Sequence, residues 1–342
     1  MSQTQPAATT RRFTWRRLLQ YRLRSLLILT TVAAVWCAWW SYKARQQGEA
    51  VAALQIAGGI VKYDLSLPWT GKMYPPPQWP NWLLDLFGVD YFASVQELRA
   101  TNTFTDADLS NVRCLTNLRL LNLSYTQVTD DGLRNIAHLT NLYRLRLSKT
   151  PLSKSQLTDA GAKHLQGLTS LTELYLDGTQ VTGEGLKHLR ELKNLNTLIL
   201  TNTEIDDDGL VHLQNLISLH QLDLKYTRVT GAGLKHLESL TFLETLDLTC
   251  NQVTDADLKN FRGLTKLATL RVGRTRVTDA SLEYLNTNMQ CLDLGGTQVT
   301  DAGLKHLQSF TELHLLNLEH TQVTGAGVTR LKQSLPNCDI RH

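Results

Sequence analysis

One phrase recurs along the chain from Leu98 to the end, usually at intervals of 24 residues: L-x-x-L-x-L-x-x-T-x-V-T-D-x-G-L-x-x-L. A repeat of this length is the signature of a solenoid, because a single turn cannot bury its apolar side without stacking on its neighbours. Ten turns follow the phrase, and a degenerate eleventh turn surrounds Cys338 and Ile340. The sequence therefore predicts one stack of turns from residue 97 to residue 342.

The leucine pair in each turn predicts a short strand. In x-L-x-L-x the leucines alternate with variable residues, so they face inward while their neighbours face outward on the concave side. In the following segment, such as Gly185 to Leu192, leucines recur every three residues, which is typical of a short helix or 3₁₀ stretch. We predict an α/β horseshoe with a parallel concave sheet and convex short helices.

The polar positions of the phrase predict structural roles. Threonines such as Thr126 and Thr179 recur at one position, with Asn251 replacing them once, and we expect them to satisfy turn backbone. In Val128-Thr129-Asp130 we expect a buried anchor, a helix cap and an acid near the helix N-terminus. Five extra residues lie in or beside 151–156, and such insertions sometimes form binding loops.

The leucine spacing and the T-x-V-T-D-x-G-L phrase resemble the leucine-rich repeat family, in a bacterial form common in planctomycetes. The resemblance covers residues 97 to 340. The repeats are also similar to those of F-box/leucine-rich repeat proteins, which are substrate receptors of ubiquitin ligases. That second resemblance implies an adaptor role as an alternative, although the chain has no F-box-like segment.

The first 42 residues predict a membrane anchor. Residues 1–24 form a basic tail, and an uncharged run of 18 residues, 25–42, follows it. At about 1.5 Å per residue this run just spans a hydrocarbon core of about 30 Å. Trp36, Trp39, Trp40 and Tyr42 cluster at its far end like an interfacial belt, and the arginines predict a cytoplasmic N-terminus. A cleaved signal peptide and a helix that does not enter a membrane are the alternatives.

Residues 43–96 predict a cap over the first turn, with a helix at 49–54 and a strand at 60–63.

The net charge of +4 reflects the tail, because residues 1–42 contain six arginines and no acid, which leaves −2 for the remainder. Such a near-neutral remainder argues against a nucleic-acid partner. The five cysteines lie at different positions in different segments, so we predict no disulfide.

The concave face predicts the binding residues, because packing does not fix them. Aromatic and arginine side chains are favoured anchors at protein interfaces. The alternative is a solvated face on which the charges pair across neighbouring strands. The candidate ligand-binding residues are Arg144, Arg146, Tyr175, Asp223, Lys225, Asp247, Arg271 and Asp293.

Metal and catalytic sites are not predicted. Histidines recur at one helical position, where a metal ladder is conceivable, but zinc favours a compact tetrahedral shell and simple duplication explains the pattern. The aspartates occur once per turn, without the oxygen-rich loop that calcium favours. No P-loop, nucleophile-elbow or zinc-protease motif occurs, so we expect no enzyme activity and no cofactor. The recurring histidines are His164, His188, His212, His236 and His306.

Three functions follow as hypotheses. The first is a single-pass anchored scaffold, with its repeats outside the cytoplasm, at the inner membrane or periplasm of a bacterium, that binds a protein or an envelope polymer through the concave face. The second is a structural envelope component that associates with itself. The third is the ubiquitin-ligase adaptor that the second resemblance implies.

Overall fold

The computed structural model of the chain describes residues 15–64, 89–91, 93–148 and 157–342. These residues fall into two compact units, one with α1 up to Gly48 and the short 3₁₀ turn η1 (Val89–Tyr91), the other with Glu49 onward and all of the repeats. The insertion at 151–156 and Thr150 lie outside the described residues.

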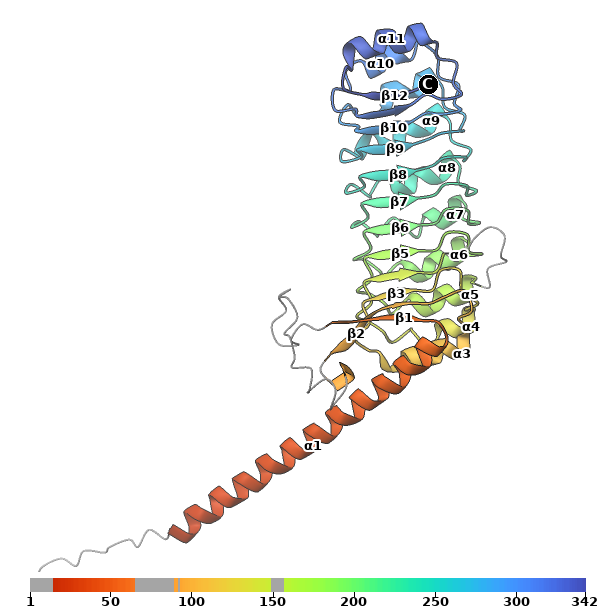
Figure 1. Cartoon of the computed structure of the whole chain (residues 1–342). Coiled ribbons are helices and arrows are strands. Elements are labelled where there is room, and N and C mark those ends of the chain that lie inside the picture. Colours follow the sequence, from red (N-terminus) through yellow and green to blue (C-terminus); the bar gives the residue numbers. More distant parts are fainter. Residues whose placement is uncertain (1–14, 65–88, 92, 149–156) are drawn as a thin grey trace, which may run out of the picture. The chain divides into compact units, whose positions relative to one another are not determined.

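The second unit is built on one sheet of twelve strands whose spatial order is their order in the chain (Figure 1). From β2 onward every neighbouring pair is parallel, and each turn contributes one strand. The predicted solenoid with a parallel sheet is thus confirmed, down to the degenerate last turn. The parallel strands are β2 (Ser94–Arg99), β3 (Leu120–Asn122), β4 (Arg144–Arg146), β5 (Glu173–Tyr175), β6 (Thr197–Ile199), β7 (Gln221–Asp223), β8 (Thr245–Asp247), β9 (Thr269–Arg271), β10 (Cys291–Asp293), β11 (Leu315–Asn317) and β12 (Asp339–Arg341).

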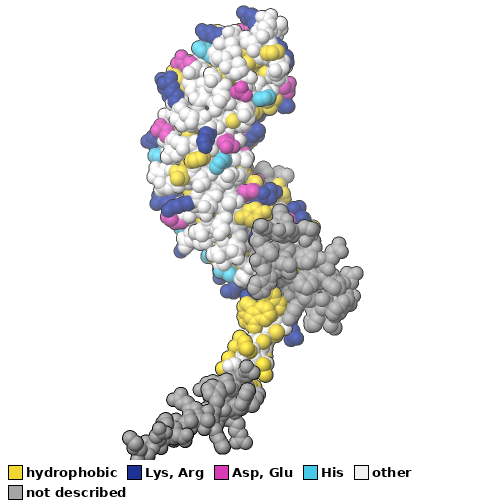
Figure 2. Space-filling model, turned by 90° about the vertical axis from the view of Figure 1, so that its left-hand side faces the viewer, with side chains coloured by type: hydrophobic (Ala, Val, Ile, Leu, Met, Phe, Trp, Pro, Cys, Tyr) yellow, Lys and Arg dark blue, Asp and Glu magenta, His cyan; other side chains and the backbone are white. Residues whose placement is uncertain are grey.

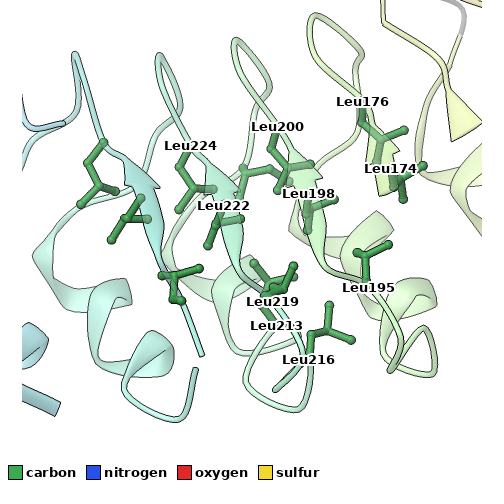
Figure 3. Close-up of a cluster of buried hydrophobic side chains, with 14 of the residues drawn as sticks. Leu174, Leu176, Leu195, Leu198, Leu200, Leu213, Leu216, Leu219, Leu222 and Leu224 are labelled. Atoms are coloured by element: carbon green, nitrogen blue, oxygen red, sulfur yellow. The ribbon is translucent and has the colours of Figure 1, made fainter. Parts of the chain in front are cut away.

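The leucines of the strands form the core, as the alternation predicts. Leu198, Leu200 and Leu222 are each 0% exposed, and Figure 3 shows such strand leucines packed with leucines from the helical side of the same turns. Because the pitch brings equivalent leucines of successive turns side by side, a single hydrophobic cluster runs from Val51 to Cys338. Burying one leucine stabilises the fold by about 1.5–3 kcal/mol, so the stack gains stability turn by turn.

Short helical segments cover the other side of the core (Figure 1). Six of them begin after a threonine whose hydroxyl accepts a hydrogen bond from a nearby backbone N–H, as Thr129 does from Asp131, so the predicted cap is confirmed in these turns. The segments are α3 (Asp106–Leu109), η2 (Ser110–Cys114), α4 (Asp130–Leu133), α5 (Asp159–Ala162), η3 (Lys163–Leu165), α6 (Gly183–Leu186), η4 (Lys187–Leu189), α7 (Asp207–Leu210), α8 (Gly231–Leu234), η5 (Lys235–Leu237), α9 (Asp255–Leu258), η6 (Lys259–Gly263), η7 (Asp279–Tyr284), α10 (Leu304–Leu307) and α11 (Gly325–Ser334).

The N-terminal end of the stack is closed by elements that do not follow the repeat. The predicted helix at 49–54 forms the last turns of the long helix α1 (Trp15–Ile56), where Val51 and Leu54 join the core. The predicted strand at 60–63 is β1 (Ile60–Asp64), which pairs antiparallel with β2. β1 is the edge strand of the sheet, and it covers the side of β2 that no repeat strand pairs with.

The recurring threonines satisfy turn backbone, as expected. The hydroxyl of Thr179 donates to the carbonyl of Leu176, and equivalent threonines bind in the same way. At the one substituted position, Asn251 donates to the carbonyls of Leu224 and Leu248 and so connects two turns.

The recurring aspartate has a larger role than the expected charge at a helix N-terminus. Its carboxylate accepts two hydrogen bonds from the threonine of the next turn, one from the backbone N–H at 2.7–2.8 Å and one from the hydroxyl at 2.5–2.7 Å. We call this contact the aspartate clamp. It joins Asp106 to Thr129, Asp130 to Thr158, Asp159 to Thr182, Asp207 to Thr230, Asp255 to Thr278, Asp279 to Thr300 and Asp301 to Thr324.

The recurring glycine makes room for the clamp. Gly303 has φ −70° and ψ −30°, which any residue can adopt, but a Cβ there would lie 2.2 Å from the carboxylate of Asp279. Where Gly231 replaces the aspartate, Asp257 of the next turn binds its own Thr254 instead, and a Cβ at Gly231 would lie 1.8 Å from that carboxylate. The two arrangements therefore exclude each other at one junction.

Candidate ligand-binding face

The last residue of each parallel strand lies directly beside its counterpart in the next strand. Arg146 is the register partner of Tyr175, Tyr175 of Ile199, and Ile199 of Asp223. We call this row the strand column. The pitch thus brings six of the eight candidate binding residues into one line, whereas Arg144 is the first residue of β4 and Lys225 follows β7. The row has the order Arg99, Asn122, Arg146, Tyr175, Ile199, Asp223, Asp247, Arg271, Asp293, Asn317 and Arg341.

Four side chains of β4 and β5 form a connected network. Arg144 donates to the carboxylate of Glu173, and the hydroxyl of Tyr175 donates to the same carboxylate at 3.0 Å. The guanidinium carbon of Arg146 lies 4.5 Å from the centre of the Tyr175 ring. Burial alone would raise the pKa of Glu173, but hydrogen bonds from Arg144 and Tyr175 outweigh it and hold that pKa below its ordinary value. The carboxylate therefore stays ionised and fixes both neighbours.

The aspartates of the strand column hold the backbone that follows each strand. Asp223 accepts a hydrogen bond from the N–H of Lys225 at 2.9 Å, and Asp247 accepts one from Thr249 at the same distance. Asp293 accepts one from Gly295 and another, at 2.8 Å, from the amide of Asn317. These residues therefore have a structural role in addition to any contact with a ligand.

The charged residues of the strand column differ in whether they are paired. Asp247 is only 5% exposed and lies 3.6 Å from Arg271, which fits the alternative of pairing across strands. Asp223 forms no ion pair within the described part of the chain. Burial raises its pKa against the opposing hydrogen bonds from the Lys225 N–H and Thr201, and the neighbouring Asp247 carboxylate raises it further.

One edge of the strand column is formed by residues in the left-handed conformation. Tyr125 (φ +64°) and Tyr226 (φ +54°) take the position that glycine occupies as Gly178 and Gly296 in other turns. Both tyrosines are exposed, at 54% and 47%, and the ammonium of Lys225 lies 5.2 Å from the Tyr226 ring centre. A bulky residue at positive φ costs about 1–2 kcal/mol, so this edge carries exposed aromatic rings at the expense of stability.

The helical side carries half-exposed histidines at the recurring position, as expected. Burial and nearby cations, Lys187 for His188 and Arg190 for His212, lower the pKa of both rings. Among the residues that the structure describes, no group of three His, Cys, Asp or Glu side chains is arranged to hold a metal ion. The five cysteines are free thiols.

Sequence reasoning missed the exposed aromatic ring of Phe242, on the edge where each turn enters its strand. In several turns an asparagine there bridges to the preceding turn, as Asn194 does to the carbonyl of Thr169. Phe242 takes that place in one turn and is 44% exposed, with the Lys266 ammonium 3.9 Å from its ring centre. The loss of the recurring asparagine was the available signal. Figure 2 shows one face of the repeats, with small hydrophobic groups scattered among polar and charged side chains.

Comparison with solved structures finds several similar chains. The chain resembles two internalins of Listeria monocytogenes, inlF (20% identity, 73% of this chain and 85% of that one, TM-score 0.46) and inlC2 (25% identity, 68% and 92%, TM-score 0.46). It also resembles an LRR protein of Leptospira interrogans (19% identity, 68% and 74%, TM-score 0.40). No curated protein sequence matches the chain.

A family model gives the more direct result. The model described as Leucine Rich repeat matches residues 114–137, 167–189, 239–261 and 285–308. Each matched segment contains the helical part of a turn whose strand belongs to the parallel sheet. These four segments of the solenoid are therefore similar to leucine-rich repeats.

Proposed function

We propose that this protein is a membrane-anchored scaffold that binds another protein through the strand column. Leucine-rich repeat domains generally present such a face to a partner, and binding rather than catalysis is the proposed activity. The observation that carries the proposal is a row of outward side chains that the core does not use, in which Arg146 and Asp223 have no ion-pair partner among the described residues. Exposed Tyr125 and Tyr226 beside the row add the aromatic surface favoured at interfaces.

The anchor is residues 25–42 of α1, within the helical segment Ser25–Ile56. It is long and apolar enough to cross a membrane, and its most apolar window is not buried against any part of the chain that the structure describes. Leu27, Leu29 and Val35 are 58–67% exposed, and Figure 2 shows the hydrophobic side chains of this segment uncovered. Exposed apolar surface of this extent needs a cover such as lipid. The arginines before it support a cytoplasmic N-terminus, with the repeats outside the cytoplasm.

Partner capture tests the binding proposal. The full-length protein, solubilised in detergent, is compared with a triple variant in which Arg146, Tyr175 and Asp223 become alanine. Asp247 stays unchanged because it is only 5% exposed and is paired with Arg271. The matched control is alanine at the exposed Arg134, Glu184 and Lys187 of the helical side. We expect a protein partner to be lost from the triple variant and kept by the control; equal capture by both would refute the role of the strand column.

Two measurements separate the alternatives. Sedimentation that shows only monomers over a wide concentration range argues against a self-associating envelope component. Protease added outside intact cells, or outside the inner membrane, cleaves the repeats if they lie outside the cytoplasm. Protected repeats would favour the adaptor role instead, and capture of a polysaccharide in place of a protein would favour an envelope polymer as ligand.

A further inference from the structure

The strand column contains one arginine that lacks the partner its counterparts have. Arg99 pairs with Glu97, Arg271 with Asp247 and Arg341 with Asp339. Arg146 has no acid within 4.0 Å among the residues that the structure describes, and its guanidinium is held on the ring of Tyr175. Its Nε, like that of Arg144, is buried and has no hydrogen-bond acceptor within that part of the chain.

The two halves of the strand column differ in their supply of carboxylates. In the second half, donors and acids alternate as Asp247, Arg271, Asp293 and Asn317, with Arg271 and Asn317 each close to an acid. In the first half, Arg99, Asn122 and Arg146 follow one another without a carboxylate in the row. The two Nη groups of a guanidinium can donate parallel hydrogen bonds to the two oxygens of a carboxylate. A carboxylate from a ligand could therefore bind Arg146, to which the row supplies no acid.

Asp223, three strands further along the sheet than Arg146, is an acid without a paired cation among the described residues. Asp223 has the Lys225 N–H and Thr201 as hydrogen-bond donors but no cation within 4.0 Å among the described residues. Between Arg146 and Asp223 the row presents the ring of Tyr175 and the side chain of Ile199. At about 4.8 Å per strand, the two unpaired charges lie about 14 Å apart, with an aromatic and an aliphatic group between them.

We propose that the strand column binds an extended polypeptide segment whose carboxylate is held by Arg146 and whose ammonium or guanidinium group, about 14 Å away, is held by Asp223. An extended peptide covers this distance in about four residues, since each residue advances about 3.3 Å. A polymer with carboxylates alone meets the carboxylates of Asp223 and Asp247 and is repelled. The inference rests on the proposed function and names the chemistry of its ligand.

Terminally blocked five-residue peptides test the proposal by fluorescence anisotropy with the full-length protein in detergent. The probe has glutamate first, leucine in the middle and lysine last. Three relatives replace the glutamate by glutamine, the lysine by glutamine, or the lysine by a second glutamate. We expect the first peptide to bind about tenfold more tightly than each of the other three, as loss of a charge-assisted contact implies.

Two variants assign the charges. Arg146→Gln is expected to weaken the glutamate–lysine peptide about tenfold and to leave the glutamine–lysine peptide unchanged. Asp223→Asn is expected to leave the glutamate–glutamine peptide unchanged, and it keeps an acceptor for the Lys225 N–H, as Asn122 does for Ser124 at the same position. The matched control Arg134→Ala removes an exposed guanidinium of the helical side and should change nothing.

The outcomes separate this inference from the proposed function. Absence of peptide binding, equal binding of all four peptides, or tighter binding of the doubly acidic peptide overturns the inference. So does an equal effect of Arg146→Gln on every peptide. If the alanine triple variant still loses its protein partner in those cases, the proposed function stands while the ligand chemistry is wrong; if it keeps the partner, both fail.

Discussion

The aspartate clamp predicts that Gly303→Ala destabilises the parent protein but does not destabilise a variant in which Asp279 is alanine. Asp279→Ala removes the acceptor of the Thr300 N–H at 2.8 Å and of its hydroxyl at 2.6 Å, in a part-buried setting. Two hydrogen bonds to a charged acceptor that is partly solvated are worth about 2 kcal/mol in total. The free energy of unfolding should fall by that amount.

Gly303→Ala should act through the same contact. The three atoms nearest to a Cβ at this position all belong to Asp279, at 2.2, 2.8 and 3.1 Å, so the carboxylate must shift away from its place on Thr300. Ser281, at the equivalent position one turn earlier, shows that a Cβ can be accommodated where the segment is 3₁₀ throughout. The cost therefore stays below full loss of the clamp, at about 1.5 kcal/mol, because alanine also recovers up to about 1 kcal/mol of helix propensity.

The double variant should be less destabilised than the sum of the single variants. Once Asp279 is alanine, the added methyl of Gly303→Ala meets no carboxylate, and it should be neutral or stabilising by up to about 0.5 kcal/mol. Urea unfolding followed by far-UV circular dichroism measures the cycle, since all seven tryptophans precede residue 83 and do not report on the repeats. Additivity within about 0.5 kcal/mol would refute the reasoning.

Three further outcomes are expected. Tyr125→Gly should raise the free energy of unfolding by up to about 1 kcal/mol in the same urea assay, because the left-handed φ of +64° no longer strains a side chain; a loss of stability would contradict that. The folded-state pKa of Glu173 is lowered, so its contribution is fully present above the ordinary value of 4.5 and is lost as pH falls through the lowered pKa; urea titrations from pH 7 to pH 3 should show a smaller loss for Arg144→Ala than for the parent. Leu29→Arg, a charge in the proposed anchor, should release the protein from membranes in alkaline carbonate, whereas the parent stays in the pellet.

The sequence predicted the parts of the fold that depend on periodicity. Paired leucines at a constant interval determine both which residues are buried and which outward residues become neighbours. Arg146 and Tyr175 are 29 residues apart, yet alternation and pitch alone place them side by side. The strand β1 was expected, but its antiparallel pairing with β2 was not, because it stands outside the repeat and has no template.

The state of individual charges could not be predicted in the same way. Asp223 and Asp247 occupy equivalent positions in adjacent turns, yet the first has no cation within 4.0 Å among the described residues and the second is buried beside Arg271. Pairing depends on side-chain reach and on which neighbour has an acid, neither of which a repeat pattern encodes. The clamp was missed for a related reason. Thr129 was expected to cap a helix and Asp130 to lie near its N-terminus, and their contacts with the neighbouring turns appear only in three dimensions.

The alternative junction at Gly231 and Asp257 has a consequence for how such a chain can change over generations. An aspartate at position 231 alone would place its side chain where the carboxylate of Asp257 lies. Loss of Asp257 alone would leave the N–H of Thr254 without this acceptor. Each intermediate is less stable than either end state, so the two sites should be inherited as a matched set, 26 positions apart. Relatives that differ at one of them are expected to differ at both, and copying or deleting a single turn is safest where the unbroken Asp–Thr–Gly pattern lies on either side of the cut.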